Sequence, residues 1–138
     1  LLGLVGSEMC IRDSLYPNDD NKKIILTNAA LTEGLVDASL LYVYSIRYAG
    51  DQKPSEVWQK LQLTKIENTI DYLDKNVSND FNPSKVYISH IGLIVALDYL
   101  NFRKIYDWEM KTKNLDAWHK QVSASMPGYK ETYPKDPS

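Results

Sequence analysis

Apolar side chains recur at helical spacing along most of the chain. Between residues 21 and 48 there is no proline and apolar groups return every three or four positions, which predicts one helix about 42 Å long at 1.5 Å per residue. A second helix is predicted from Glu56 to about Val77, with Ser55 as its cap. Its predicted inward residues are Val57, Leu61, Ile66, Ile70, Leu73 and Val77.

A third segment, about residues 88–103, is apolar on nearly every side from Ile91 to Leu100, which predicts a helix enclosed by other helices. It is too short to span a bilayer, which takes about 20 apolar residues, and Asp98 interrupts it. The pattern therefore predicts an all-α fold, a helical bundle around this buried central helix.

The remaining segments are shorter. Gly50 and Pro54 end the first helix, and a short loop predicts antiparallel packing of the first two helices. Turn chemistry is predicted at residues 79–83. Near the end of the chain, Asn114 is expected to cap a short helix that stops at residues 126–128 and is followed by one more turn. No strand pair and no internal repeat is predicted.

The first helix carries two different stripes. Leu31, Leu35, Ala38 and Tyr42 form a stripe suited to burial. Glu33, Asp37, Leu40 or Leu41, and Tyr44 form a mixed stripe of acid, aliphatic and phenol side chains. Such a stripe is typical of a wall facing a cleft, although an ordinary boundary stripe with its acids in water has the same pattern. Gly34, inside this helix, indicates either close approach of another group or a tolerated defect that costs about 1 kcal/mol.

Composition narrows the class of protein. With 138 residues, 43% of them hydrophobic, the chain is expected to form one globular domain and no membrane segment. Acids and bases are interspersed and the net charge is −2, so no nucleic-acid footprint is present. A single cysteine, Cys10, excludes an internal disulfide or a multi-cysteine metal site, and a cytoplasmic setting is expected.

No catalytic constellation is apparent. His90 and His119 lie on different elements without neighbours at metal-ligand spacing, so structural roles and no metal site are predicted. Asp98 is a carboxylate in an apolar run, so it must stay neutral, pair with a base, bind a helix N-terminus or face a partner surface. No second acid accompanies Asp98 on its helix, and no phosphate loop, nucleophile elbow or dinucleotide fingerprint is present. We expect no catalytic residue in this chain.

Several motifs, taken in order, resemble the helical C-terminal domain of bacterial cytosolic glutathione transferases. They are Leu15-Tyr-Pro17, Ala29 to Ala38, Ile91 to Arg103, Asp107-Trp108, Asn114 to Trp118 and Met126-Pro-Gly-Tyr129. The similarity runs from about Leu15 to Pro134. Residues 1–14 differ in style and resemble a leader that arises when adaptor or vector sequence is translated. We expect this leader to be foreign to the fold and neither Ser7 nor Cys10 to perform chemistry.

The resemblance implies a domain organisation. In this family a thioredoxin-like N-terminal domain binds glutathione and activates its thiol, while the helical domain supplies most of the pocket for the electrophile. We therefore expect residues 15–20 to be a remnant of the interdomain linker, residues 21–134 the helical domain and residues 135–138 a tail. The thioredoxin-like domain is expected to be missing, so the fragment alone should be inactive, with glutathione a co-substrate of the full-length protein and no cofactor bound by this domain alone.

The resemblance also implies site residues. Thr32 and Glu33 fall where some members reach glutathione, and Glu33, Asp37, Leu40 and Tyr44 would line the pocket for a hydrophobic small-molecule substrate. The first two helices would form a homodimer interface. Many members start the buried helix with Ser or Thr followed three residues later by Asp; here Tyr87 and His90 take those places, and Ser89 is expected to act as a one-sided cap.

The expected parent activity is conjugation of glutathione to hydrophobic electrophiles, a detoxification reaction. One alternative is a non-catalytic protein-interaction domain of the same fold, and another is a stand-alone bundle that binds an apolar ligand. The authentic upstream sequence separates them, because a thioredoxin-like segment with its cis-proline favours the enzyme and an unrelated domain favours the adaptor.

Overall fold

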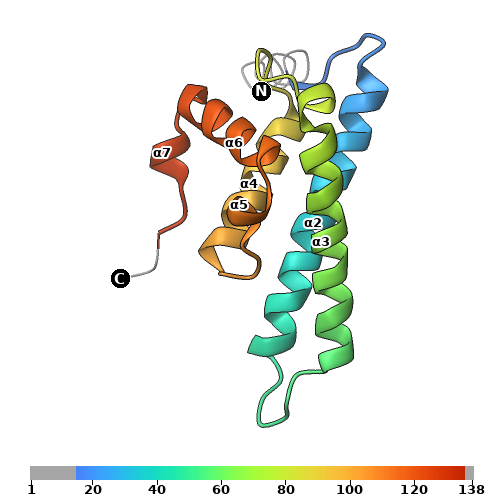
Figure 1. Cartoon of the computed structure of the whole chain (residues 1–138), viewed down its shortest axis with the longest axis vertical. Coiled ribbons are helices and arrows are strands. Elements are labelled where there is room, and N and C mark those ends of the chain that lie inside the picture. The colour runs from blue at the N-terminus through green and yellow to red at the C-terminus, as the bar shows by residue number, and fades with distance from the viewer. Residues whose placement is uncertain (1–14, 136–138) are drawn as a thin grey trace, which may run out of the picture.

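The computed structural model describes residues 15–135, and every regular element in this range is a helix (Figure 1). The helices are α2 (Lys22–Arg47), α3 (Glu56–Asp80), α4 (Ile88–Phe102), α5 (Trp108–Lys111), α6 (Asn114–Ser125) and α7 (Tyr129–Thr132). The predicted all-α bundle is therefore confirmed. The predicted leader, residues 1–14, and most of the predicted tail, residues 136–138, lie outside the described residues.

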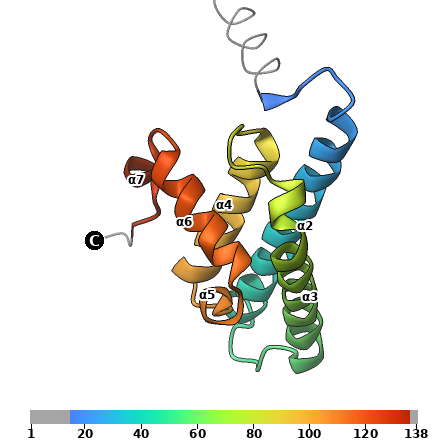
Figure 2. The same ribbon diagram turned by 45° about the horizontal axis from the view of Figure 1, so that its top comes forward.

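Two long helices form the frame of the bundle. Figures 1 and 2 show α2 and α3 side by side as an antiparallel pair, with α4 packed along α2 and α6 against α3. The predicted bounds of α2 and α4 agree with the structure to within about one residue. However, α3 continues to Asp80 through part of the predicted turn, because Val77 and Phe81 are both buried and anchor its last turn.

The core lies where α2, α3, α4 and α6 meet. Apolar residues with no exposed surface come from α3, α4, the turn before α4 and the α5–α6 segment. They include Ile66, Ile70, Leu73, Val77, Phe81, Leu93, Ala96, Leu97, Leu100, Trp108, Leu115 and Val122. The central helix α4 therefore packs as predicted along most of its length.

Three apolar residues predicted to be enclosed are exposed. Val57 and Leu61 are 83% and 47% exposed, because the start of α3 extends past the other helices and only α2 runs beside it (Figure 1). Val95 on α4 is 55% exposed, so the central helix does have one solvent-facing position. The prediction that α4 is enclosed on every side is wrong at this point.

The close approach suggested for Gly34 occurs elsewhere. Gly34 is exposed and nothing lies within 4 Å of a Cβ built there, so it is a tolerated defect in α2. At Gly92, a Cβ would lie 2.5 Å from Oγ1 of Thr32. Gly92 thus allows α4 to lie directly against α2.

The start of α4 is capped by a histidine. Nδ1 of His90 accepts a hydrogen bond from the backbone N–H of Tyr87 at 3.3 Å, and Nε2 donates to the carbonyl oxygen of Asn82 at 2.9 Å. His90 therefore takes the reciprocal role that the third helical residue has in a capping box. The predicted cap by Ser89 is wrong, since its buried hydroxyl has no partner within residues 15–135.

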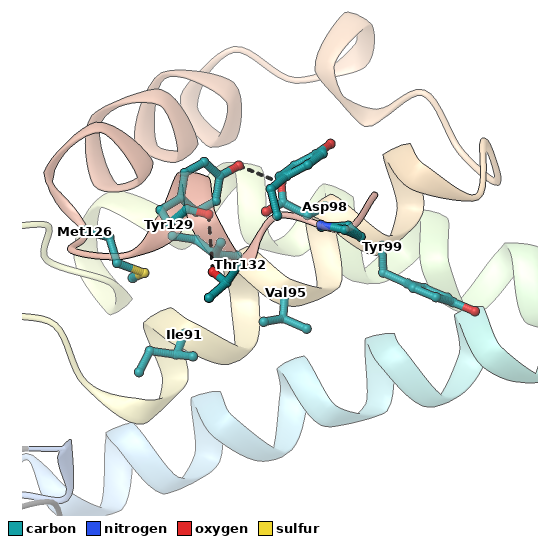
Figure 3. Close-up of a pocket in the computed structure, with 10 residues that line it drawn as sticks. Ile91, Val95, Asp98, Tyr99, Met126, Tyr129 and Thr132 are labelled. Atoms are coloured by element: carbon teal, nitrogen blue, oxygen red, sulfur yellow. Dashed lines mark hydrogen bonds between the residues drawn. The ribbon is translucent and has the colours of Figure 1, made fainter. Parts of the chain in front are cut away.

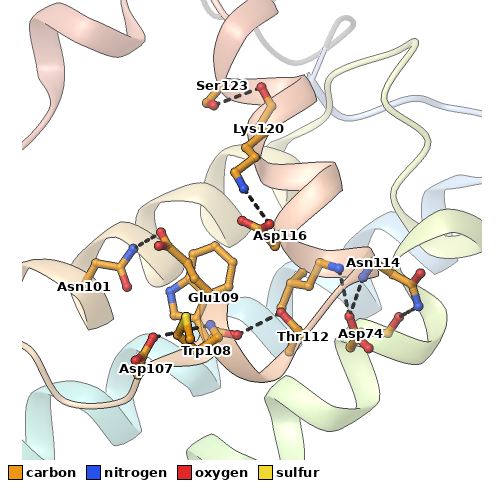
Figure 4. A network of polar contacts seen from close by, with 12 residues as sticks. Asp74, Asn101, Asp107, Trp108, Glu109, Thr112, Asn114, Asp116, Lys120 and Ser123 are labelled. Atoms are coloured by element: carbon orange, nitrogen blue, oxygen red, sulfur yellow. Dashed lines mark hydrogen bonds and ion pairs between the residues drawn. The ribbon is translucent and has the colours of Figure 1, made fainter.

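The start of α6 is capped from another helix. Asn114, the predicted cap, is instead the first helical residue. One carboxylate oxygen of Asp74 on α3 accepts from the backbone N–H groups of Asn114 and Leu115, each at 2.9 Å (Figure 4). A carboxylate at this place satisfies unpaired donors and interacts favourably with the helix dipole.

Within the described residues, one helix, α2, is long and apolar enough to cross a membrane by length and composition, and a third of its most apolar 18-residue stretch is buried. Contact with α3 and α4 accounts for the apolar side that faces the core. The apolar side chains that remain exposed on α2 include Ile24, Leu41, Tyr44 and Ile46.

Candidate functional site

A pocket of about 330 Å³ lies between α4 and the segment around α7 (Figure 3). This volume is in the range of small-molecule sites, which begins near 300 Å³. The lining is mostly aliphatic and aromatic: Ile91, Ile94, Val95, Asp98, Tyr99, Met126, Tyr129, Thr132, Tyr133 and Pro134.

A tight turn after α6 places the second wall of this pocket. Gly128 has a left-handed backbone, with φ 76°, that glycine adopts without a steric penalty. Immediately after this turn α7 begins, and the Thr132 hydroxyl donates to the carbonyl oxygen of Gly128 at 2.9 Å. The turn thereby brings Tyr129 and Tyr133 over α4.

A polar cluster forms one side of the pocket. Asp98, only 5% exposed, accepts two hydrogen bonds at Oδ1. One comes from the Tyr129 hydroxyl at 3.1 Å (Figure 3), and the other from Nε2 of His119 at 2.8 Å. The buried carboxylate therefore pairs with a base, one of the outcomes predicted for it. The ring of Trp108 meets His119 edge to face, with the centroids 5.2 Å apart.

Two tyrosines of the pocket, Tyr129 and Tyr133, have a raised pKa. Burial, and then the charge of Asp98, raise the pKa of Tyr129 well above its usual value. The pKa of Tyr133 is raised by the same two causes and by Glu109. At physiological pH both tyrosines are therefore neutral hydrogen-bond donors beside a carboxylate.

The structure places the sequence-predicted site residues on α2. Thr32 is buried, with its hydroxyl donating to the carbonyl oxygen of Ala29 at 2.8 Å. Glu33 and Asp37 are exposed, and Leu40 is half-buried. Tyr44 is 43% exposed and meets the Tyr48 ring edge to face.

The predicted stripe and the pocket lie on the same side of the α2–α4 pair. Both helices start at the same end of the bundle (Figures 1 and 2), and they meet where Gly92 faces Thr32. Leu35 of α2 and Leu93 of α4 turn to one side of this contact, into the core. By helical periodicity, the stripe of Glu33 to Tyr44 on α2 and the pocket-lining Val95 on α4 turn to the other side.

Most of the pocket was not predicted. The apolar run of α4 gave no sign that Ile91 and Val95 would lie at an opening, and the contact with residues 126–134 depends on a chain reversal. The available signal was Asp98, a carboxylate in an apolar helix.

His90 and His119 both bind protein groups, in agreement with the structural roles predicted for them. No group of three or more His, Cys, Asp or Glu side chains gathers within residues 15–135.

Solved structures with a similar fold are members of the glutathione transferase family. A family member from Pseudomonas fluorescens Pf-5 with bound S-(propanoic acid)-glutathione is 30% identical, with a TM-score of 0.80 over 90% of this chain and 64% of that one. The structure from the same organism with bound glutathione is 31% identical, with a TM-score of 0.80 over 88% and 59%. A glutathione S-transferase from Methylobacillus flagellatus KT with glutathione bound is 25% identical, with a TM-score of 0.76 over 88% and 61%.

This chain thus spans less than two thirds of the length of these similar proteins. No family model matches its sequence, and no curated protein does. The similarity covers nearly all of the described helices, and the all-helical fold is that of a C-terminal domain of the glutathione transferase type.

Proposed function

We propose that this chain, a helical domain of the glutathione transferase type, binds the electrophilic substrate of an enzyme that conjugates glutathione to hydrophobic electrophiles. The observation that carries the proposal is the apolar pocket between α4 and α7 in a domain whose similar structures hold glutathione or a glutathione conjugate. A mainly apolar concave site with a few polar groups suits such a substrate.

Beyond the pocket, the proposed cleft would continue along the mixed stripe on α2. Asp37, Leu40 and Tyr44 would extend the electrophile site beyond the pocket, because they face the same side as Val95. Thr32 and Glu33 would lie toward glutathione. Of these two, exposed Glu33 is the better placed to touch a ligand, since the hydroxyl of Thr32 is buried against α4.

Activation of the glutathione thiol would come from a thioredoxin-like domain joined through residues 15–20 to the helical domain at residues 21–134. Such activation needs groups that lower the thiol pKa and hold it beside the electrophile. The pocket of this chain offers Asp98 and tyrosines but no lysine, arginine or histidine among its lining residues. The helical domain by itself would therefore bind electrophile without conjugating it, and a cytoplasmic setting would supply the glutathione.

A homodimer through α2 and α3 completes the proposal. Large apolar side chains are exposed along both helices, among them Ile24, Ile46, Val57, Trp58 and Leu61. Exposed apolar area of this kind is typical of an interaction surface. The same observation favours the alternative function, a non-catalytic protein-interaction domain of the same fold.

Binding of a neutral aryl halide, followed by chemical shifts, tests the proposed function. We expect saturable shifts that are lost in Val95→Trp, since an indole there fills the pocket. Met110→Trp, at a position 84% exposed on α5, is the matched control and should bind like the wild type. Equal binding by both variants, or no binding by the wild type, would remove the support for an electrophile site here.

A further inference from the structure

We infer, taking the electrophile-binding role proposed above as given, that the pocket between α4 and α7 selects apolar ligands that carry a protonated amine, which Asp98 binds. The inference starts from the second carboxylate oxygen of Asp98. Oδ1 receives the hydrogen bonds from His119 and Tyr129, while no hydrogen bond reaches Oδ2 from any residue in the range 15–135.

Oδ2 is not fully enclosed and keeps some accessible surface, so a ligand can reach it. Only 5% of the surface of Asp98 is exposed, and the residue lines the pocket together with aliphatic and aromatic side chains (Figure 3). A carboxylate oxygen that has no protein donor and stays accessible is a free acceptor for a group that enters the pocket. A donor on the ligand would supply the missing bond.

The charge around the pocket favours a cation over a neutral donor. Asp98 is its one acidic lining residue, and no lysine, arginine or histidine lines it. Glu109 adds to the negative potential, since it raises the pKa of Tyr133 along with Asp98. The one base in contact with Asp98, His119, approaches Oδ1 from α6. A hydrogen bond between an ammonium group and a carboxylate is roughly twice as strong as a neutral one.

The remaining walls define the rest of the ligand. Ile91 and Val95 of α4 and Met126 before α7 present aliphatic and thioether surface, and Tyr99 presents a ring. A volume of about 330 Å³ is at the lower end of ligand sites, so one aromatic ring with a short aminoalkyl arm fits the chemistry of the pocket. Anionic ligands are disfavoured by repulsion from Asp98.

The test compares three ligands that share a phenyl ring: 2-phenylethylamine, 2-phenylethanol and phenylacetate. Dissociation constants are measured by chemical-shift titration of the full chain near neutral pH. We expect the amine to bind about tenfold more tightly than the alcohol, and phenylacetate to bind most weakly. Asp98→Asn should weaken amine binding about tenfold and change alcohol binding by less than about twofold.

Val95→Trp should abolish binding of the amine, and Met110→Trp should not change it, which locates the amine in this pocket. If Asp98→Asn fails to fold, the preference of the wild type for amine over alcohol decides the question. Equal affinity for the amine and the alcohol would overturn the inference while leaving the proposed function standing. Failure of all three ligands and of the neutral aryl halide to bind would overturn both.

Discussion

The contact between Thr32 and Gly92 sets how closely two of the main helices approach. Gly92→Ala would place its new Cβ 2.5 Å from the Thr32 Oγ1, which forces a shift of packed groups. Overpacking of this kind costs about 1–3 kcal/mol, so we expect the free energy of unfolding to fall by that amount. Urea denaturation of the variant measures it.

Two controls separate the clash from the general effect of replacing glycine. In a Thr32→Ala background, which removes the hydroxyl, Gly92→Ala should cost less than in the wild type. Gly34→Ala, where a Cβ meets open space, should stabilise α2 by about 0.5–1 kcal/mol. A loss of stability in Gly34→Ala as large as in Gly92→Ala would contradict the proposed packing.

His90 makes the stability of the chain depend on pH. Its ring is buried, which holds the pKa of His90 below its usual value, against a smaller opposite effect of the hydrogen bond to Asn82. The two partners require a neutral ring, because Nδ1 accepts from Tyr87. The unfolded chain binds this proton more readily, so the contribution is fully present above about pH 6.5 and is lost as the pH falls below it.

Unfolding free energies measured between about pH 5 and 8 test this prediction. We expect the wild type to lose stability toward the acidic end and His90→Gln to show a flatter profile. The aromatic neighbours of the ring, Phe81, Tyr87 and Trp118, carry no charge that would mask the effect. An identical slope in the two proteins would assign the pH dependence to another group.

At the level of elements, the α6 start depends on a residue of α3. Asp74→Ala removes the acceptor of two backbone N–H groups, each 2.9 Å away, and we expect a loss of about 1–2 kcal/mol in unfolding free energy. Asp71, exposed one turn earlier on α3, is the matched control, and Asp71→Ala should change stability by less than about 0.5 kcal/mol. Equal effects of the two substitutions would show that the cap contributes nothing.

The same example shows why the caps of α4 and α6 were predicted less well than the helices themselves. The apolar spacing predicted α2 and α4 because helical periodicity is a local property. The Asp74 cap joins positions 40 residues apart in the chain, and the proton positions on His90 follow from two specific contacts. The Asp74 contact leaves no local pattern in the sequence, and the contact of His90 with Tyr87, although local, does not use the usual residue types of a capping box.

For the whole molecule, the exposed apolar side chains of α2 and α3 predict association. We expect the isolated chain to form dimers or to bind a hydrophobic dye, as exposed apolar surface of this kind does. Trp58→Lys combined with Leu61→Lys should lower the dimer fraction in sedimentation experiments. Met110→Lys, at an apolar position 84% exposed on α5, is the control and should not. A monodisperse monomer that ignores the dye would contradict this prediction.

The candidate site was predicted only in part, because one part of it lies on a single helix and the other part depends on tertiary contacts. The stripe of Glu33, Asp37, Leu40 and Tyr44 follows from the periodicity of one helix, and whether it binds substrate stays a prediction. The pocket needs α4 and the residues after Gly128 together, so it arises only from the tertiary arrangement. Asp98 connects the two levels, since it lies on α4 and its partners are Tyr129, which follows Gly128, and His119 of α6.

The central claim is that these helices form the electrophile-binding half of a cleft whose thiol-activating half is a thioredoxin-like domain. The most direct test is the rate of glutathione conjugation to a chromogenic aryl halide. It is measured for this chain alone and for the chain joined at residue 15 to the thioredoxin-like domain of a glutathione transferase. We predict no rate above the uncatalysed reaction for the chain alone, and turnover by the fusion that Val95→Trp lowers. Conjugation by the chain alone at the rate of the fusion would contradict the claim.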